Sequence, residues 1–257
     1  MAKKEEQIEG QMSLAMCLNS EHYVVQSNNF VNTKQHLNKN EGKLIRTAIM
    51  QIKREDKELK PYVITVSEFA DLIGTSKNDV YRDIRKICMG ITKKPVEIKQ
   101  KREVKGKIVE HWAAIPWTKR CEYDTGTGMI YITLNDELKP FLLDLQEQYT
   151  QYTLDNILGM KSQYGFRLFE LIQSRIMARV IPKSGISVEV MLDDLRDSLG
   201  LEGKYKTFGS LRQKVIDAGV QDINTYTLYR VTYDYIKERS KIIGLRFHVN
   251  MLSLIHI

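Results

Sequence analysis

The segment Thr65-Val-Ser-Glu-Phe-Ala-Asp-Leu-Ile-Gly-Thr-Ser-Lys-Asn-Asp-Val-Tyr-Arg-Asp-Ile-Arg-Lys-Ile87 determines the expected fold. Thr65 and Glu68 have capping-box spacing, so they predict the start of a short helix. Gly74 predicts its end, because a helix C-terminus favours a residue that tolerates positive φ. Ser76 then predicts the start of a second helix with an apolar stripe. Two helices separated by a glycine-containing turn of this length indicate a helix-turn-helix.

The residues around this segment predict the rest of a first domain. The expected elements are a helix over 41–54, a strand over 62–66, hairpin strands over 96–98 and 108–115, a strand pair over 120–123 and 129–134, and a helix from 135 to 145. Lys105-Gly106 supplies the turn of the first hairpin. A helix-turn-helix followed by a basic hairpin is the order of a winged helix, so we expect this hairpin to be the wing.

The second half of the chain repeats this plan. Its predicted elements are helices over 163–180, 187–199 and 206–218 and strands over 226–235 and 242–249. The expected fold class is therefore α+β, with two tandem winged-helix domains that each combine a helix-turn-helix with a β-hairpin wing. The predicted organisation is an N-terminal tail (1–22), a first winged-helix domain (23–150), a second winged-helix domain (151–250) and a C-terminal tail (251–257).

Composition limits the class of protein and its partners. The 257 residues are 42% hydrophobic and 28% charged, which is typical of a globular protein, and no apolar run approaches the roughly 20 residues of a membrane-spanning helix. No secretory signal is indicated, so we expect a cytoplasmic protein. Cys17, Cys88 and Cys121 lack the spacing of a disulfide framework or a metal site. The net charge of +7 favours a polyanionic partner.

Basic residues concentrate where a wing is expected. Residues 93–120 contain nine Lys or Arg and three Glu, a local net charge of +6 (9 − 3). Such a stretch is also typical of a solvated protein face, and its composition alone does not separate the two interpretations.

Candidate DNA-contacting residues are those that face away from the core on the second helix of each helix-turn-helix, which enters the major groove, and on the hairpins, where cations neutralise phosphates. In the second domain they are Lys204, Lys206, Thr207, Ser210, Arg212, Gln213, Lys214, Arg239 and Lys241. In the first domain they are Lys77, Asn78, Tyr81, Arg82, Arg85, Lys99, Lys101, Arg102, Lys105 and Lys107. Gln213 and Lys214 are the strongest candidates for contacts to base edges, because Gln can pair with adenine and Lys can donate to guanine.

Several segments resemble the Rep_3 type of plasmid replication initiator. They are 23–30 (Tyr-Val-Val-Gln-Ser-Asn-Asn-Phe), 41–49 (Glu-Gly-Lys-Leu-Ile-Arg-Thr-Ala-Ile), 134–145, and 205–218 followed by Ile223-Asn224. The resemblance runs from about Tyr23 to Val249. Its most specific part is the pattern Tyr-x-x-Phe-x-x-Leu-Arg at 205–212.

The resemblance implies a function. Proteins of this type bind direct repeats (iterons) at a plasmid origin as monomers and commonly repress their own gene at an inverted repeat as dimers. It therefore implies double-stranded DNA (origin repeats and operator) and a second copy of the chain as partners, with a host initiator ATPase and a replicative helicase as further candidates. It places base recognition mainly in the second domain, on Thr207, Ser210, Gln213 and Lys214, and the dimer contact in the first.

Other functions need residues in other patterns. A rolling-circle initiator needs a closely spaced His pair beside a Tyr nucleophile, and the five His residues are scattered through the chain. An ATPase loop needs Gly-Lys-Ser/Thr, which Gly203-Lys-Tyr205 does not provide. We therefore expect no enzyme, no cofactor and no metal. A winged-helix transcription regulator without a replication role stays open, because fold alone does not separate it from an initiator.

Overall fold

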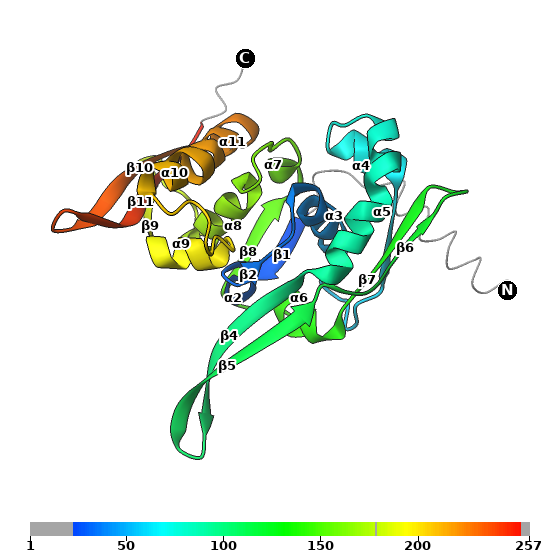
Figure 1. The fold of residues 1–257 in the computed structure, drawn as a ribbon, viewed down its shortest axis with the longest axis horizontal. Helices are drawn as coiled ribbons and strands as arrows, with labels where there is room; N and C mark the ends of the chain where they lie inside the picture. Colours follow the sequence, from blue (N-terminus) through cyan, green and yellow to red (C-terminus); the bar gives the residue numbers. More distant parts are fainter. Residues whose placement is uncertain (1–22, 178, 253–257) are drawn as a thin grey trace.

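Two winged helices follow one another along the chain, so the predicted α+β class with tandem winged-helix domains is confirmed (Figure 1). The computed structural model describes residues 23–252 except 178. The predicted tail 1–22, with Cys17, and residues 253–257 of the other predicted tail lie outside the described residues.

The first winged helix runs from α3 to β7. Its elements are α3 (Lys39–Met50), β3 (Pro61–Thr65), α4 (Val66–Leu72), α5 (Lys77–Lys93), β6 (Thr118–Asp124) and β7 (Met129–Leu134). Thr65 and Glu68 form the predicted capping box of α4, and the Ser76 hydroxyl caps α5. Gly74 has a φ of 63° directly after the end of α4, which is the conformation that glycine adopts without strain. The sheet is antiparallel in the order β3-β7-β6.

The second winged helix runs from α8 to β11. Its elements are α8 (Gly165–Ile176), β9 (Ile186–Met191), α9 (Leu192–Ser198), α10 (Phe208–Leu211), the π-helical turn η2 (Arg212–Asp217), α11 (Ala218–Tyr226), β10 (Tyr229–Glu238) and β11 (Lys241–Met251). The sheet has the order β10-β11-β9, and it corresponds to the sheet β6-β7-β3 of the first winged helix. In both sheets the second strand of a hairpin pairs with a strand that precedes the hairpin in the sequence. The internal repeat therefore includes the strand between the first two helices.

The predicted helix over 187–199 is wrong in its first half. Ile186–Met191 is strand β9, which pairs antiparallel with β11, and only Leu192–Ser198 is helical. Val188 and Val190 are buried, whereas the alternate residues Ser187 and Glu189 are exposed. This alternation has the period of two that a half-buried strand requires, and β-branched residues favour it.

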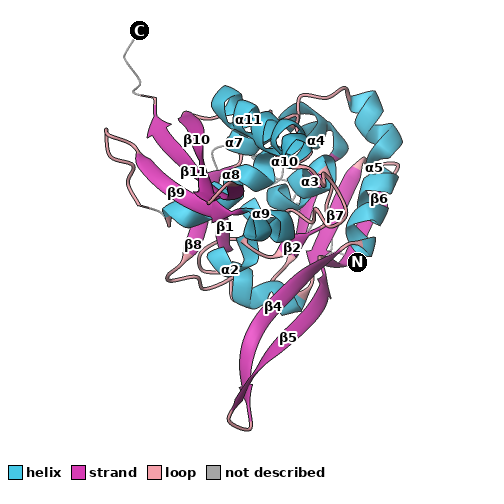
Figure 2. Ribbon diagram, turned by 60° about the vertical axis from the view of Figure 1, so that its left-hand side comes forward, coloured by secondary structure: helices cyan, strands magenta, loops and turns pink. Residues whose placement is uncertain are grey.

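The predicted wing of the first winged helix is also wrong. β4 (Pro95–Val104) and β5 (Lys107–Pro116) form the hairpin around Lys105-Gly106, but they belong to a separate sheet with β2 (Lys34–Gln35). The hairpin that pairs with β3 is β6–β7, so it occupies the position of the wing. The β4–β5 hairpin instead projects from the body on the side away from α4 and α11 (Figures 1 and 2).

The remaining elements connect the two winged helices. η1 (Asp136–Leu138) and α6 (Lys139–Leu142) replace the longer helix predicted to Leu145. β1 (Tyr23–Ser27) leads into α2 (Asn28–Val31), and β8 (Tyr149–Thr153) leads into α7 (Asp155–Leu158). β1 and β8 pair as a two-stranded antiparallel sheet. The boundary predicted at residue 150 falls within β8, and it stays a prediction.

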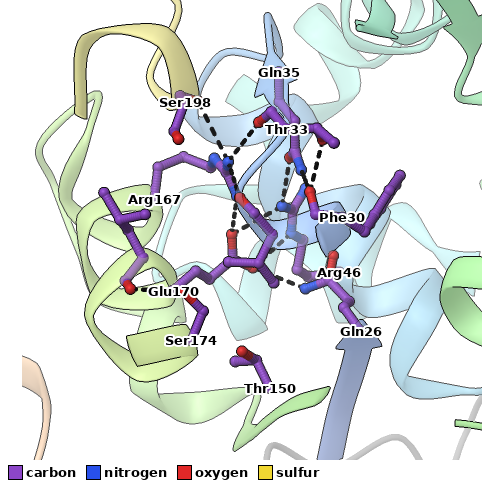
Figure 3. Close-up of polar contacts among 12 residues, drawn as sticks. Gln26, Phe30, Thr33, Gln35, Arg46, Thr150, Arg167, Glu170, Ser174 and Ser198 are labelled. Carbon is purple, nitrogen blue, oxygen red and sulfur yellow. Dashed lines mark hydrogen bonds and ion pairs between the residues drawn. The ribbon is translucent and has the colours of Figure 1, made fainter. Parts of the chain in front are cut away.

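A buried ion network joins α3 of the first winged helix to α8 of the second (Figure 3). The Glu170 carboxylate on α8 accepts hydrogen bonds from Arg46 Nη2 at 2.9 Å, Arg167 Nη1 at 2.5 Å and Gln26 Nε2 at 3.0 Å. Burial alone would raise the pKa of Glu170, but the two guanidinium groups lower it to about 2. Arg167 also donates to the carbonyl oxygen of Ser198, at the end of α9. The network therefore fixes the two winged helices relative to each other.

Candidate DNA-binding interface

The recognition helix of the second winged helix is continuous from α10 through η2 to α11 and is longer than predicted. Thr207 caps its start, because the Thr207 hydroxyl accepts a hydrogen bond from the Ser210 amide. Within η2, Arg212, Gln213 and Lys214 are three consecutive exposed residues. A π-helical turn is wider than an α-helical one and is frequent at functional sites. It presents all three side chains to solvent on one broad surface.

A hollow between α9 and the wing β10–β11 is lined by three basic residues and by apolar side chains. Its volume is about 460 Å³, and Arg196, Lys206 and Lys241 contribute to its lining together with Asp193. Arg196 was not predicted. Its guanidinium donates to the carbonyl oxygens of Lys204 at 3.1 Å and of Tyr205 at 2.6 Å, and so it holds the loop before the recognition helix. A hollow lined by these cations suits a DNA phosphate, which is bound by charge and hydrogen bonds.

The wing β10–β11 turns tightly at Arg239, which has a φ of 53°, and Ser240. Arg239 and Lys241 are exposed at this tip, as predicted for contacts to the sugar-phosphate backbone. Sequence reasoning missed the wing residues that face the recognition helix. The Tyr235 hydroxyl accepts a hydrogen bond from Arg212 Nη1 at 3.3 Å. The alternation of tyrosines along β10 was the available signal.

The recognition helix of the first winged helix is α5. The predicted residues on it are all exposed: Lys77, Asn78, Tyr81, Arg82 and Arg85. Acidic neighbours contact two of the cations, since Lys77 lies 3.4 Å from Asp71 and Arg82 lies 2.9 Å from Asp79. Tyr81 packs against Gly128 at the tip of the β6–β7 wing, where an added methyl group would lie 2.6 Å from the Tyr81 hydroxyl. Tyr81 therefore connects this helix to its wing.

The cations of the β4–β5 hairpin are exposed but are not brought to the wing position. They are Lys99, Lys101, Arg102, Lys105 and Lys107. Lys99 forms an ion pair with Asp197 of α9 at 2.8 Å, which ties the base of the hairpin to the second winged helix. The hairpin also exposes apolar side chains, including Ile108 and Trp112. Any contact that it makes with DNA is thus separate from the contacts of α5.

Features of other kinds of site are absent from the described part of the chain. The described residues contain no group of three His, Cys, Asp or Glu side chains able to hold a metal ion. Over 23–252, residue 178 aside, no helix is both long enough and apolar enough to cross a membrane. Cys88 and Cys121 are free thiols.

The fold and the two exposed recognition helices define a DNA-binding protein with tandem winged-helix domains. The sequence matches the family models described as "Initiator Replication protein, WH1" over residues 23–173 and "Initiator Rep protein, WH2" over residues 191–249. The chain therefore belongs to this family of replication initiator proteins, and the resemblance found in the sequence is confirmed.

Two known proteins are similar to the chain. A "Replication initiation protein" from Escherichia coli is 22% identical over 219 residues, which cover 84% of this chain and 66% of the relative. The chain thus matches about two thirds of the length of that relative. The crystal structure of the Pi initiator protein in complex with iteron DNA has a TM-score of 0.73 at 16% identity and covers 91% of this chain and 99% of that one. This similarity confirms the fold.

Proposed function

We propose that the chain initiates plasmid replication by binding repeated sequences (iterons) at the origin as a monomer, and that it represses its own gene as a dimer. The observation that carries the proposal is that one chain contains two complete winged helices, each with an exposed polar recognition helix. Two DNA-binding domains in tandem suit a direct repeat, whereas a two-fold symmetric dimer suits an inverted repeat. The similarity to an initiator described as bound to iteron DNA supports the first half of the proposal.

The proposed function also specifies the binding partners of the chain and assigns it no catalytic activity. The partners are double-stranded DNA, a second copy of the chain that docks through the first winged helix, a host initiator ATPase and a replicative helicase. The protein acts by binding, is not an enzyme, and works in the cytoplasm. Membership of a replication initiator family supports this assignment.

A complementation experiment tests the replication role. A plasmid that carries the DNA flanking the gene, with the gene itself deleted, is introduced into cells that supply the chain in trans or supply a frameshifted copy. We expect the plasmid to persist only with the intact chain. Persistence with the frameshifted copy would leave a transcription regulator as the function. Footprinting on the same flanking DNA identifies the bound repeat.

The proposed oligomers are tested separately. Sedimentation combined with footprinting should assign the monomer to direct repeats and the dimer to an inverted repeat. A single oligomer that protects both kinds of site equally would overturn this part of the proposal.

A further inference from the structure

Arg212 differs from the other cations predicted to face DNA in the second winged helix. Its Nε lies 3.6 Å from Oδ2 of Asp217, and its Nη1 donates to the Tyr235 hydroxyl. The cations that form no ion pair with any described residue are Lys204, Lys206, Lys214, Arg239 and Lys241. Those five side chains are free to follow phosphates, whereas Arg212 is held by partners on the helix and on the wing.

Asp217 is the centre of this arrangement. One carboxylate oxygen faces Arg212, and the other accepts a hydrogen bond from the Tyr233 hydroxyl. Tyr233 and Tyr235 are two residues apart on β10, so both rings lie on the face toward the helix. The Tyr235 ring meets the Phe208 ring edge-on with centroids 5.3 Å apart, which anchors it to the start of the recognition helix. Burial and the Asp217 carboxylate raise the pKa of Tyr233, so its hydroxyl stays a donor.

We propose that Asp217 and Tyr233 are positioning residues that hold Arg212 against the wing and away from DNA phosphates, and thereby increase discrimination between the cognate repeat and other DNA. The proposal rests on the proposed function, because it assumes that η2 faces DNA. An arginine that contacts a phosphate strengthens binding to every sequence and carries no sequence information. With Arg212 held back, the base contacts expected of Gln213 and Lys214 determine more of the total affinity.

The direct test is Asp217→Asn, which keeps the shape of the side chain and removes its charge. Binding is measured from 0.1 to 0.4 M salt on a duplex with the footprinted repeat and on a scrambled duplex of the same composition. On the scrambled duplex we expect the slope of log K against log salt to steepen by about 0.9, because one more phosphate is neutralised. Over the measured fourfold range of salt, that change in slope corresponds to a loss of affinity roughly 3.5-fold larger than the wild type shows. On the repeat, base contacts already fix the register of the helix, so the increase in affinity is smaller and the ratio of affinities falls.

Asp234→Asn is the matched control. It makes the same change of charge on the strand that carries Tyr233 and Tyr235, but Asp234 lies on the other face of β10, where its carboxylate contacts His248 at 3.0 Å. It should leave the ratio of affinities unchanged. Adding Arg212→Gln to Asp217→Asn should abolish the increase in affinity, since that increase is attributed to the released guanidinium. Tyr233→Phe should shift the ratio in the same direction by a smaller factor.

Each alternative outcome overturns the proposal. An unchanged ratio for Asp217→Asn, an equal change for Asp234→Asn, or an increase in affinity that survives Arg212→Gln would each show that Asp217 does not restrain Arg212. If Asp217→Asn does not fold, the single variant Arg212→Gln tests the proposal. It should then leave the salt slope on scrambled DNA unchanged, and a slope reduced by about 0.9 would show that Arg212 already contacts a phosphate. If the wild-type protein bound the repeat and the scrambled duplex with nearly equal affinity, the proposed function itself would be wrong.

Discussion

Replacing Glu170 by Gln should destabilise the protein severely, because Glu170 is the only carboxylate within the described residues that pairs with Arg46 and Arg167. Gln has nearly the same shape, so the change removes charge and leaves little cavity. Both guanidinium groups are then buried without a counter-charge, and the amide group of Gln points a donor toward other donors. Removing one partner of a buried ion pair typically costs about 3–5 kcal/mol.

The expected shift in melting temperature follows from the size of the chain. For proteins of 150–250 residues, each kcal/mol lowers Tm by about 2–4 °C, so Glu170→Gln should lower Tm by roughly 6–20 °C. Calorimetry or circular dichroism measures this directly. Glu189→Gln is the control, because Glu189 pairs with Arg246 at 2.8 Å on an exposed face, where an ion pair contributes about 0–1 kcal/mol. A drop in Tm for Glu170→Gln no larger than that of the control would refute the reasoning.

The same carboxylate predicts a dependence of stability on pH. The pKa of Glu170 in the folded protein is about 2, below its ordinary value of 4.5. A depressed pKa of an acid contributes stability that is fully present above pH 4.5 and is lost as the pH falls toward 2. The free energy of unfolding of the wild type should therefore fall over this range more steeply than that of Glu170→Gln. Parallel curves for the two proteins would contradict this assignment.

Three further predictions concern the DNA surface. Gln213→Ala and Lys214→Ala should each cost about 1–3 kcal/mol on the cognate repeat and little on a scrambled duplex, and equal costs on both duplexes would remove η2 from base readout. Lys101→Ala with Arg102→Ala should lower the salt slope of binding by about 1 for each phosphate that is no longer neutralised, and an unchanged slope would leave the β4–β5 hairpin as a solvated surface. Gly128→Ala should lower Tm, because φ is 71° there and Tyr81 occupies the space; denaturation at wild-type temperature would count against this.

The parts of the fold that depend on local signals could be predicted from the sequence. The capping box at Thr65 and Glu68, the cap at Ser76 and the turn at Gly74 all fix backbone geometry within a few residues. The hairpin at Lys105-Gly106 was predicted for the same reason. Its place in the fold was not, because the choice between two successive hairpins depends on which one pairs with β3, far away in the sequence.

The candidate site could be predicted residue by residue but not as an arrangement. Exposure followed from helical periodicity on the helices and from the turn positions of the hairpins. Eighteen of the nineteen predicted DNA-contacting residues are exposed, and Ser210 is half-buried. The residues that these side chains contact could not be predicted. The contacts of Arg212 with Tyr235 and of Lys99 with Asp197 join separate elements, and no periodicity reports such pairs. The π-helical turn was also missed, since it depends on how the helix packs against the rest of the second winged helix.

The way in which the two winged helices are joined bears on how they read DNA together. Two recognition helices in one chain increase affinity for a double site only if their spacing matches that site, because the second contact is then made at high effective concentration. Here the spacing is held by the buried Arg46–Glu170 pair and by Arg167, which reaches the carbonyl oxygen of Ser198. These contacts lie in the core and involve no residue of either recognition helix. The sequence that each helix reads can therefore change through exposed side chains such as Gln213, while the spacing between the two reading sites stays fixed by the core.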